Sequence, residues 1–243
     1  MKLFNITFSL LLMLLFSCGK DSSCIKNAGK LVSETRPITS EINHIVLKDN
    51  IDLVLTQDSF ASLRIEAGSN LLPYVRARQK GNTLELKNDN KCNFLRSYKN
   101  EITVYLALPN IKSIDYTGHG NISSSGVLTL SELTFDTKNG TGSVNLQLDV
   151  AKLDIFLHTG PTDFKLTGKA ENIYLYSGGI GWIYCDELIG KKVHTNNAGT
   201  GDIILTATET LLIELTSIGN IDYYGTPTVT VSTNSGKGKI RKK

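Results

Sequence analysis

The sequence has little net charge and almost no clustering of charge of one sign. Its 26 lysines and arginines nearly balance 23 aspartates and glutamates. Proteins that bind nucleic acid need many basic side chains against the phosphates, which would appear as a strong basic excess. The one basic run, residues 237–243, is expected to be a solvated terminus. No nucleic-acid partner is therefore predicted.

The sequence also lacks the residue spacings that hold metals and cofactors. It has four cysteines and four histidines but no Cys-x-x-Cys or His-x-His pair. Its Gly-x-Gly segments are not followed by a helical pattern whose N-terminus could hold a phosphate. No ordered serine, histidine and aspartate set points to a nucleophilic enzyme. We predict no metal, no cofactor and no catalytic residue.

The N-terminal residues have the pattern of an export signal. Lys2 supplies a positive charge, and the apolar run to Phe16 is too short and too interrupted for a comfortable membrane span. It ends in Leu-Phe-Ser-Cys at Cys18, which resembles a bacterial lipobox. That resemblance implies a signal peptide over 1–17, lipidation of Cys18 and a lipid-anchored tether over 18–37. An ordinary signal peptide is the alternative.

The charged pair that follows the lipobox bears on location. Lys20-Asp21 resembles the surface-export signal of Bacteroidetes lipoproteins. We expect an outer-membrane lipoprotein in the cell envelope, attached to the membrane through its lipid anchor. Whether it faces the cell surface or the periplasm stays open.

From residue 116 onward the sequence repeats itself at nearly constant spacing. Each repeat has a glycine cluster, then one corner residue, then alternating apolar residues. The corner residues are Asn121, Ser143, Asp163, Trp182, Asp202, Asn220 and Lys239, which lie 22, 20, 19, 20, 18 and 19 residues apart. Fixed self-similarity of this length is typical of a solenoid.

Each repeat contains two segments with the alternation of a half-buried strand. The residue after each corner is apolar, namely Ile122, Val144, Phe164, Ile183, Ile203, Ile221 and Ile240. The inward residues of the second segment are Leu133, Phe135, Leu153, Ile155, Leu157, Ile173, Leu175, Val193, Thr195, Leu211, Ile213, Leu215, Val229 and Val231. Short turns are expected between the two segments at 167–171, 188–192 and 225–227.

These patterns predict an all-β protein built as a parallel β-helix-like solenoid, with two strands in each repeat. Stacked coils would bury the apolar residues along a shared interior, which a single coil could not do. Regular coils are predicted over 116–243, and residues 38–115 are predicted to form an N-terminal β cap on the same sheets. A β-sandwich with regular hairpins is the alternative fold, and a separate small β domain ending near Pro109 is the alternative for the cap.

The cysteines follow from this register. Cys185 falls in the inward row between Leu166 and Leu205, so we expect a small buried apolar residue. Cys24 and Cys92 lie outside the regular repeats and are the candidate disulfide pair in an oxidising envelope. Whether that bond forms stays open.

The sequence resembles the head GIN domain family of Bacteroidetes, described as putative auto-transporter adhesins. The resemblance lies in residues 50–55, 106–111 and 118–122 and in the later Gly-x-Gly corners, and it covers roughly residues 38–240. It implies a β-helical fold and a location in the cell envelope. It brings no catalytic residues to this sequence.

An enzyme acting on polysaccharides is the first competing class. Glycoside hydrolysis needs two carboxyl groups at about 5–9.5 Å. Asp163 and Asp202 occupy corners two coils apart, which at ~4.8 Å per coil is about 9.6 Å. Trp182 lies at the corner between them and would intrude. Corner aspartates also have a structural use, because they accept backbone N–H bonds in turns.

Aromatic residues favour a binding role instead. Tyr174, Tyr176, Trp182 and Tyr184 come within eleven residues, and the tyrosines have the outward parity. Exposed rings on a flat sheet can stack on sugars or anchor a protein partner. Ordinary cross-strand packing is the alternative.

We therefore expect a lipid-anchored envelope protein with a non-enzymatic, adhesin-like binding role toward a surface glycan or a protein. A structural envelope component that self-associates through exposed coil edges is a third class. The oligomeric state is not predicted.

Overall fold

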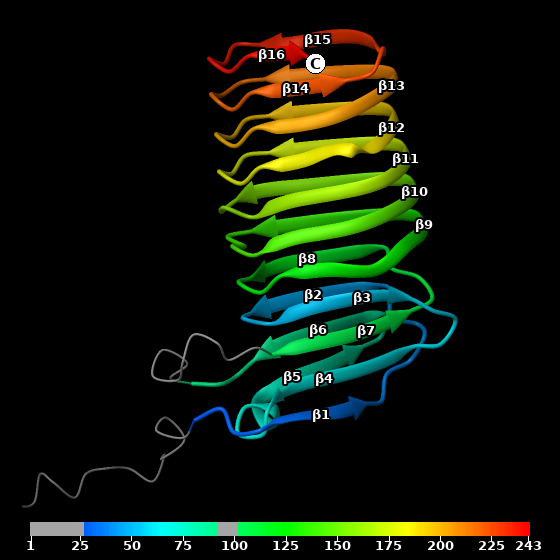
Figure 1. Cartoon of the computed structure of the whole chain (residues 1–243), viewed down its shortest axis with the longest axis vertical. Helices are drawn as coiled ribbons and strands as arrows, with labels where there is room; N and C mark the ends of the chain where they lie inside the picture. The colour runs from blue at the N-terminus through cyan, green and yellow to red at the C-terminus, as the bar shows by residue number, and fades with distance from the viewer. Residues whose placement is uncertain (1–26, 92–101) are drawn as a thin grey trace, which may run out of the picture.

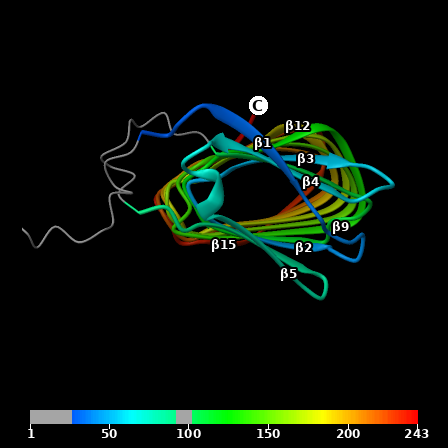
Figure 2. The same cartoon turned by 90° about the horizontal axis from the view of Figure 1, so that it is seen from below.

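The computed structural model describes residues 27–91 and 102–243, and most of them lie in one 16-stranded sheet that coils around an apolar interior. The coils stack along one long axis (Figure 1). Seen along that axis they superpose as a flattened ring (Figure 2). The predicted solenoid is confirmed.

Five long strands form the regular coils. They are β9 (Ile122–Lys138), β10 (Ser143–Thr159), β11 (Asp163–Ser177), β12 (Ile183–Asn197) and β13 (Ile203–Leu215). Each bends near its middle, so its first half lies on one face of the flattened coil and its second half on the other. We call these the first face and the second face. The bends lie along one edge of the stack, and the glycine turns lie along the other (Figure 1).

The burial pattern locates the bend. In β11, Phe164 and Leu166 are buried in the first half, whereas Ile173 and Leu175 are buried in the second half. Ala170 is buried with the parity of the first half, so the inward parity changes between positions 170 and 173, just after Gly168, which has a φ of +109°. The two segments expected in each repeat are the two halves of one bent strand. A turn separates them only in the last coil.

Neighbouring coils pair in parallel and in the register that the repeat predicts. Phe164 pairs with Val144 on one side and Ile183 on the other, and Ile183 pairs with Ile203. The second halves follow the same rule, because Ile173 pairs with Leu153 and with Val193. Like side chains thus form rows along a dry interior, which buries apolar surface that one coil alone would expose.

The C-terminal end of the interior is less well covered. β14 (Ile221–Tyr224) and β15 (Thr228–Asn234) pair with the two halves of β13, and β16 (Ile240–Lys242) pairs with β14. Val229 and Val231 keep the inward register but are 37% and 46% exposed. The expectation that they are buried is wrong, since β15 pairs with no further coil in the described structure.

Residues 44–118 continue both faces toward the N-terminal end, in a different order from the chain. β2 (His44–Asp49) pairs with β8 (Ser113–Gly118) and with β6 (Thr83–Asn88) on the second face. β3 (Asp52–Gln57) pairs with β9 and with β7 (Thr103–Leu108) on the first face. The β6–β7 coil therefore lies on the N-terminal side of the β2–β3 coil in the stack, although β6 and β7 come after β2 and β3 in the sequence.

Antiparallel strands close the N-terminal end. β4 (Ser62–Gly68) pairs with β7 and with β1 (Leu31–Arg36), and β5 (Val75–Lys80) pairs with β6. The 3₁₀ turn η3 (Leu72–Tyr74) crosses the end of the ring (Figure 2), and Leu71 and Leu72 are buried there. Because β1 is part of the sheet, residues 31–36 do not belong to a tether, contrary to the prediction for 18–37.

Candidate functional site

The corner residues hold consecutive coils together. Asp163 Oδ1 accepts a hydrogen bond from the backbone N–H of Trp182 at 2.8 Å, and Asp202 Oδ1 accepts one from that of Asn220 at 2.7 Å. The amide oxygen of Asn121 does the same for Ser143 at 3.1 Å. A short acceptor side chain at these three corners thus satisfies a backbone donor of the next coil. This gives both candidate catalytic carboxylates a structural role.

The glycine clusters are explained by the same stacking. A Cβ atom at Gly181 would collide with the carbonyl oxygen of Thr162, and one at Gly201 would collide with that of Gly181. Only a residue without a side chain allows the turns of adjacent coils to approach this closely.

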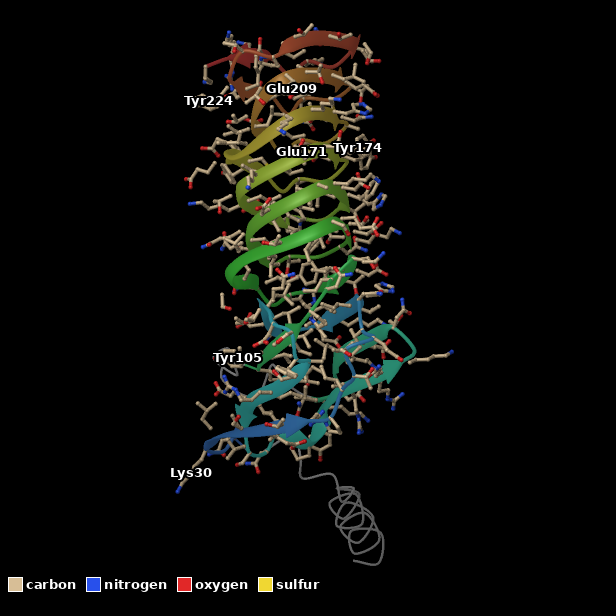
Figure 3. All side chains as sticks on the ribbon, turned by 90° about the vertical axis from the view of Figure 1, so that its right-hand side faces the viewer. Lys30, Tyr105, Glu171, Tyr174, Glu209 and Tyr224 are labelled. Carbon is tan, nitrogen blue, oxygen red and sulfur yellow. The ribbon has the colours of Figure 1, made fainter. Side chains whose placement is uncertain are left out.

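The four aromatic residues singled out in the sequence do not form one surface. Tyr174 and Tyr176 lie in the second half of β11, on the second face, whereas Tyr184 lies in the first half of β12, on the first face. Trp182 stacks on Tyr184, with ring centroids 5.6 Å apart. In Figure 3, Tyr174 projects on the side opposite to Tyr105 and Tyr224, which belong to first-face strands. The glycine turn between β11 and β12 separates the two pairs.

Three further rings join the tyrosines of the second face. Phe156 and His158 come from β10 and His194 comes from β12. Centroid distances are 5.9 Å for Phe156–His158, 5.5 Å for Phe156–Tyr174, 5.6 Å for His158–Tyr176 and 4.8 Å for Tyr174–His194. We call Phe156, His158, Tyr174, Tyr176 and His194 the ring cluster.

Sequence reasoning missed Phe156 and the two histidines, although a signal for them was present. Phe156 and His158 alternate with the inward residues Ile155 and Leu157, so their parity already placed them outside. Register pairs Phe156 with Tyr176 and Tyr174 with His194. Aligning outward positions across repeats would have found the ring cluster.

Acidic side chains next to the ring cluster contact its histidines or a lysine. His158 Nε2 lies 3.1 Å from Asp136 Oδ2, and His194 Nε2 lies 2.8 Å from Glu214 Oε1. Lys152 forms an ion pair with Asp154 at 2.6 Å. The two imidazoles remain 35% and 37% exposed.

The surroundings of Tyr174 affect the pKa of its hydroxyl and form a hollow beside it. Burial raises the pKa of its hydroxyl, and the nearby charges of Glu214 and Asp154 raise it further. A hollow of about 270 Å³ lies beside it. This hollow is lined by Tyr174, His194, Asp154, Asn172, Lys192 and Thr210, among others. The ring cluster therefore combines flat apolar faces with hydrogen-bonding groups.

The described residues do not offer a metal centre. Within 27–91 and 102–243 there is no group of three or more histidine, cysteine, aspartate or glutamate side chains that could hold an ion. The remaining histidines are used locally, since His44 contacts Asp115 at 3.0 Å and His119 contacts Thr141 at 3.0 Å.

The sequence of the chain matches a known protein family over most of its length. A family model described as "Putative auto-transporter adhesin, head GIN domain" matches residues 42–227. The chain belongs to this family. The match spans every member of the ring cluster and ends before β15. The family recognised in the sequence is thus confirmed.

Several solved structures have the same fold. A putative adhesin from Bacteroides fragilis NCTC 9343 is 26% identical, with a TM-score of 0.78 over 90% of this chain and 100% of that chain. A putative lipid binding protein from Parabacteroides distasonis ATCC 8503 is 18% identical, with a TM-score of 0.68 over 90% and 99% of the two chains. A putative adhesin from Parabacteroides merdae ATCC 43184 is 20% identical, with a TM-score of 0.63 over 90% and 98%. No curated protein matches the chain.

Of the four cysteines, Cys185 lies within the described residues. Cys18, Cys24 and Cys92 lie outside the described residues. Cys185 is a free thiol and only 1% exposed, as its inward position predicted, and burial raises the pKa of this thiol. In the part of the chain that the structure describes, no helix is long and apolar enough to cross a membrane.

Proposed function

We propose that this family member is a lipid-anchored protein of the cell envelope that binds a surface glycan or a protein without catalysing a reaction. The ring cluster is its binding surface. The observation that carries this proposal is that five rings from three adjacent coils pack against one another on the second face, with centroids of neighbouring rings 4.8 to 5.9 Å apart. The family name and the name of the Bacteroides fragilis relative support an adhesin-like role.

A purely structural reading of the rings accounts for only part of their surroundings. Cross-strand ring pairs do stabilise sheets. However, the interior already carries its own aromatic row, in which Tyr116, Phe135 and Phe164 are fully buried and pack edge to face. The outer rings add a second layer that stays in contact with water, with a hollow beside it. Such a surface is typical of a binding site.

The anchor and the envelope location rest on the signal peptide, on the lipobox at Cys18 and on the family. The absence of catalysis rests on the corner geometry. Asp163 and Asp202 are both engaged by backbone donors of the next coil, and the Trp182 corner lies between them. New reducing ends released from a uronic-acid polysaccharide would favour the enzyme class instead.

The test replaces three rings together, Phe156→Thr, Tyr174→Thr and Tyr176→Thr, because threonine keeps the strand propensity. Binding of the purified protein to glycan arrays and to intact cells is compared with that of the original protein. We expect the triple variant to lose at least about tenfold in affinity, as hot-spot rings do. Its melting temperature should change little.

A matched control removes the exposed rings of the first face, Trp182→Thr and Tyr184→Thr. These rings are also stacked on each other, but they lie away from the ring cluster. Binding should persist in this control. Unchanged binding by the triple variant, or equal loss in the control, would overturn the assignment of the surface.

A further inference from the structure

The outward side chains of the second face form two straight rows along the solenoid axis. Register places Asp136, Phe156, Tyr176, Asn196 and Glu214 in one row, with one residue from each of β9 to β13. A second row holds Asp154, Tyr174, His194 and Leu212, from β10 to β13. The first row has rings at its centre and polar or acidic groups toward both ends, whereas the second has Asp154 at one end and Leu212 at the other.

From this arrangement, and resting on the proposed function, we infer that the ligand is an uncharged linear polysaccharide. It lies along the solenoid axis, with about one sugar unit over each coil. Neighbouring parallel strands are ~4.8 Å apart. That spacing is close to the advance of one hexopyranose in an extended β-linked chain. Consecutive sugars can therefore meet equivalent positions on consecutive coils.

The chemistry of the rows matches a sugar chain. A pyranose ring presents a face of C–H groups, which packs against a flat aromatic ring, and its hydroxyls point outward at the rim. Phe156 and Tyr176 offer consecutive faces in the first row, and Tyr174 and His194 do so in the second. The Asn196 amide and the Glu214 carboxylate already contact each other at 2.9 Å, and both can exchange hydrogen bonds with hydroxyls.

The charges favour an uncharged chain. Asp136 contacts His158 and is paired with Lys138, Asp154 is paired with Lys152, and Glu214 contacts His194. An anionic sugar would approach these three carboxylates, and a cationic sugar would approach Lys138, Lys152 and Lys192 on the same surface. An uncharged ligand avoids both costs, since it leaves each pair intact.

A protein partner fits this surface less well. Protein interfaces have a core of exposed apolar side chains. The most exposed large apolar residues of the regular coils lie elsewhere, namely Ile180 and Ile218 at the glycine turns, 59% and 58% exposed, and Val127 and Ile189 within β9 and β12, 56% and 53% exposed. The rings of the cluster are only partly exposed and are interspersed with carboxylates and lysines.

The test is a length series of β-linked oligosaccharides of glucose, xylose and N-acetylglucosamine, titrated into the purified protein by calorimetry. Affinity should rise with each added sugar and level off once the chain spans the coils from β9 to β13. Oligogalacturonates of equal length, which carry a carboxylate on each sugar, should bind at least about tenfold more weakly. Phe156→Thr and His194→Thr, which change rings on the first and last of the three ring-bearing coils, should each lower the length at which affinity levels off. Trp182→Thr should not.

The outcomes separate the inference from the proposed function. If binding to cells depended on the rings and yet resisted competition by every neutral oligosaccharide, the inference of a polysaccharide ligand would be overturned. That result would indicate a protein ligand, and the ring cluster would still be the binding surface. Stronger binding of oligogalacturonate would overturn the uncharged ligand. Affinity independent of length would overturn the orientation along the axis. If no ring variant changed binding to cells, the proposal that the ring cluster is the binding surface would be wrong.

Discussion

The carboxylate of Asp202 binds both the backbone and the side chain of Asn220, one coil further along the axis. Asp202 Oδ1 accepts the Asn220 backbone N–H at 2.7 Å, and the Asn220 amide donates to both carboxylate oxygens at 3.0 and 3.1 Å. Asn220 then accepts the backbone N–H of Lys239 at 2.9 Å through its own amide oxygen. Asp202 and Asn220 are therefore consecutive acceptors that link three coils along the glycine-turn edge.

Replacing Asp202 tests whether these acceptors stabilise the fold. Asp202→Ala should lower the free energy of unfolding by about 2 kcal/mol, because hydrogen bonds to a charged group are lost and a backbone donor is left without a partner. Asp202→Asn keeps one acceptor oxygen and should lose clearly less. Urea unfolding followed by circular dichroism would measure both. If the asparagine variant were as unstable as the alanine variant, the hydrogen bond from the Asn220 backbone N–H to residue 202 would not be the source of the stabilisation.

Glycines in the turns, where adjacent coils approach closely, should not tolerate a larger residue, whereas a glycine with open space around it should. Gly181→Ala places a methyl group against the carbonyl of Thr162 and should cost about 3 kcal/mol, as overpacking does. Gly126 is the control, since a Cβ there meets nothing within 4 Å. Gly126→Ala in β9 should be neutral or slightly stabilising, because glycine weakens strands. Thermal unfolding of the two variants compares them directly, and equal losses would contradict the close-approach explanation.

Period-two alternation predicted which residues face inward, because that property depends only on local backbone geometry. Phe164, Cys185 and Leu205 are buried as expected. The alternation could not predict on which face of the flattened coil an outward residue lies, because that depends on where the strand bends. Tyr176 and Tyr184, eight residues apart, were therefore grouped although the glycine turn separates them.

The N-terminal third shows a second limit. β6 and β7 follow β3 in the sequence but stack on the far side of the β2–β3 coil, and β8 returns to the near side. Pairing of this kind is set by long-range packing, which no local pattern encodes. The segments were predicted as strands, but their order in the stack was not.

Lipidation of Cys18 remains a prediction that labelling can test. Cells that express the protein with a fatty-acid probe should label the original chain and the Cys24→Ala variant. Cys18→Ala should not be labelled and should leave the membrane fraction, because the acyl chains supply the membrane affinity. Label retained by Cys18→Ala would show that the lipobox resemblance is misleading.

The last coil is held by a partly buried ion pair with a predictable response to pH. Arg241 binds the Asp222 carboxylate at 2.5 and 2.9 Å, and Lys243 lies 3.2 Å from it. Burial raises the pKa of Asp222, but the hydrogen bonds and charges of Arg241 and Lys243 outweigh burial, so the pKa lies below its ordinary value.

A lowered carboxyl pKa stabilises the fold above the unfolded value of about 3.9, and the stabilisation is lost as the pH falls through the folded value. Asp222→Asn should therefore be less stable than the original protein at pH 7, by about 1 kcal/mol because Arg241 is 42% exposed. The difference should shrink below about pH 4. Thermal unfolding across this range measures it, with Asp186→Asn, an exposed aspartate of β12, as the control. A difference that stays constant from pH 7 to pH 3 would mean that packing at position 222, and not its charge, holds the end of the solenoid.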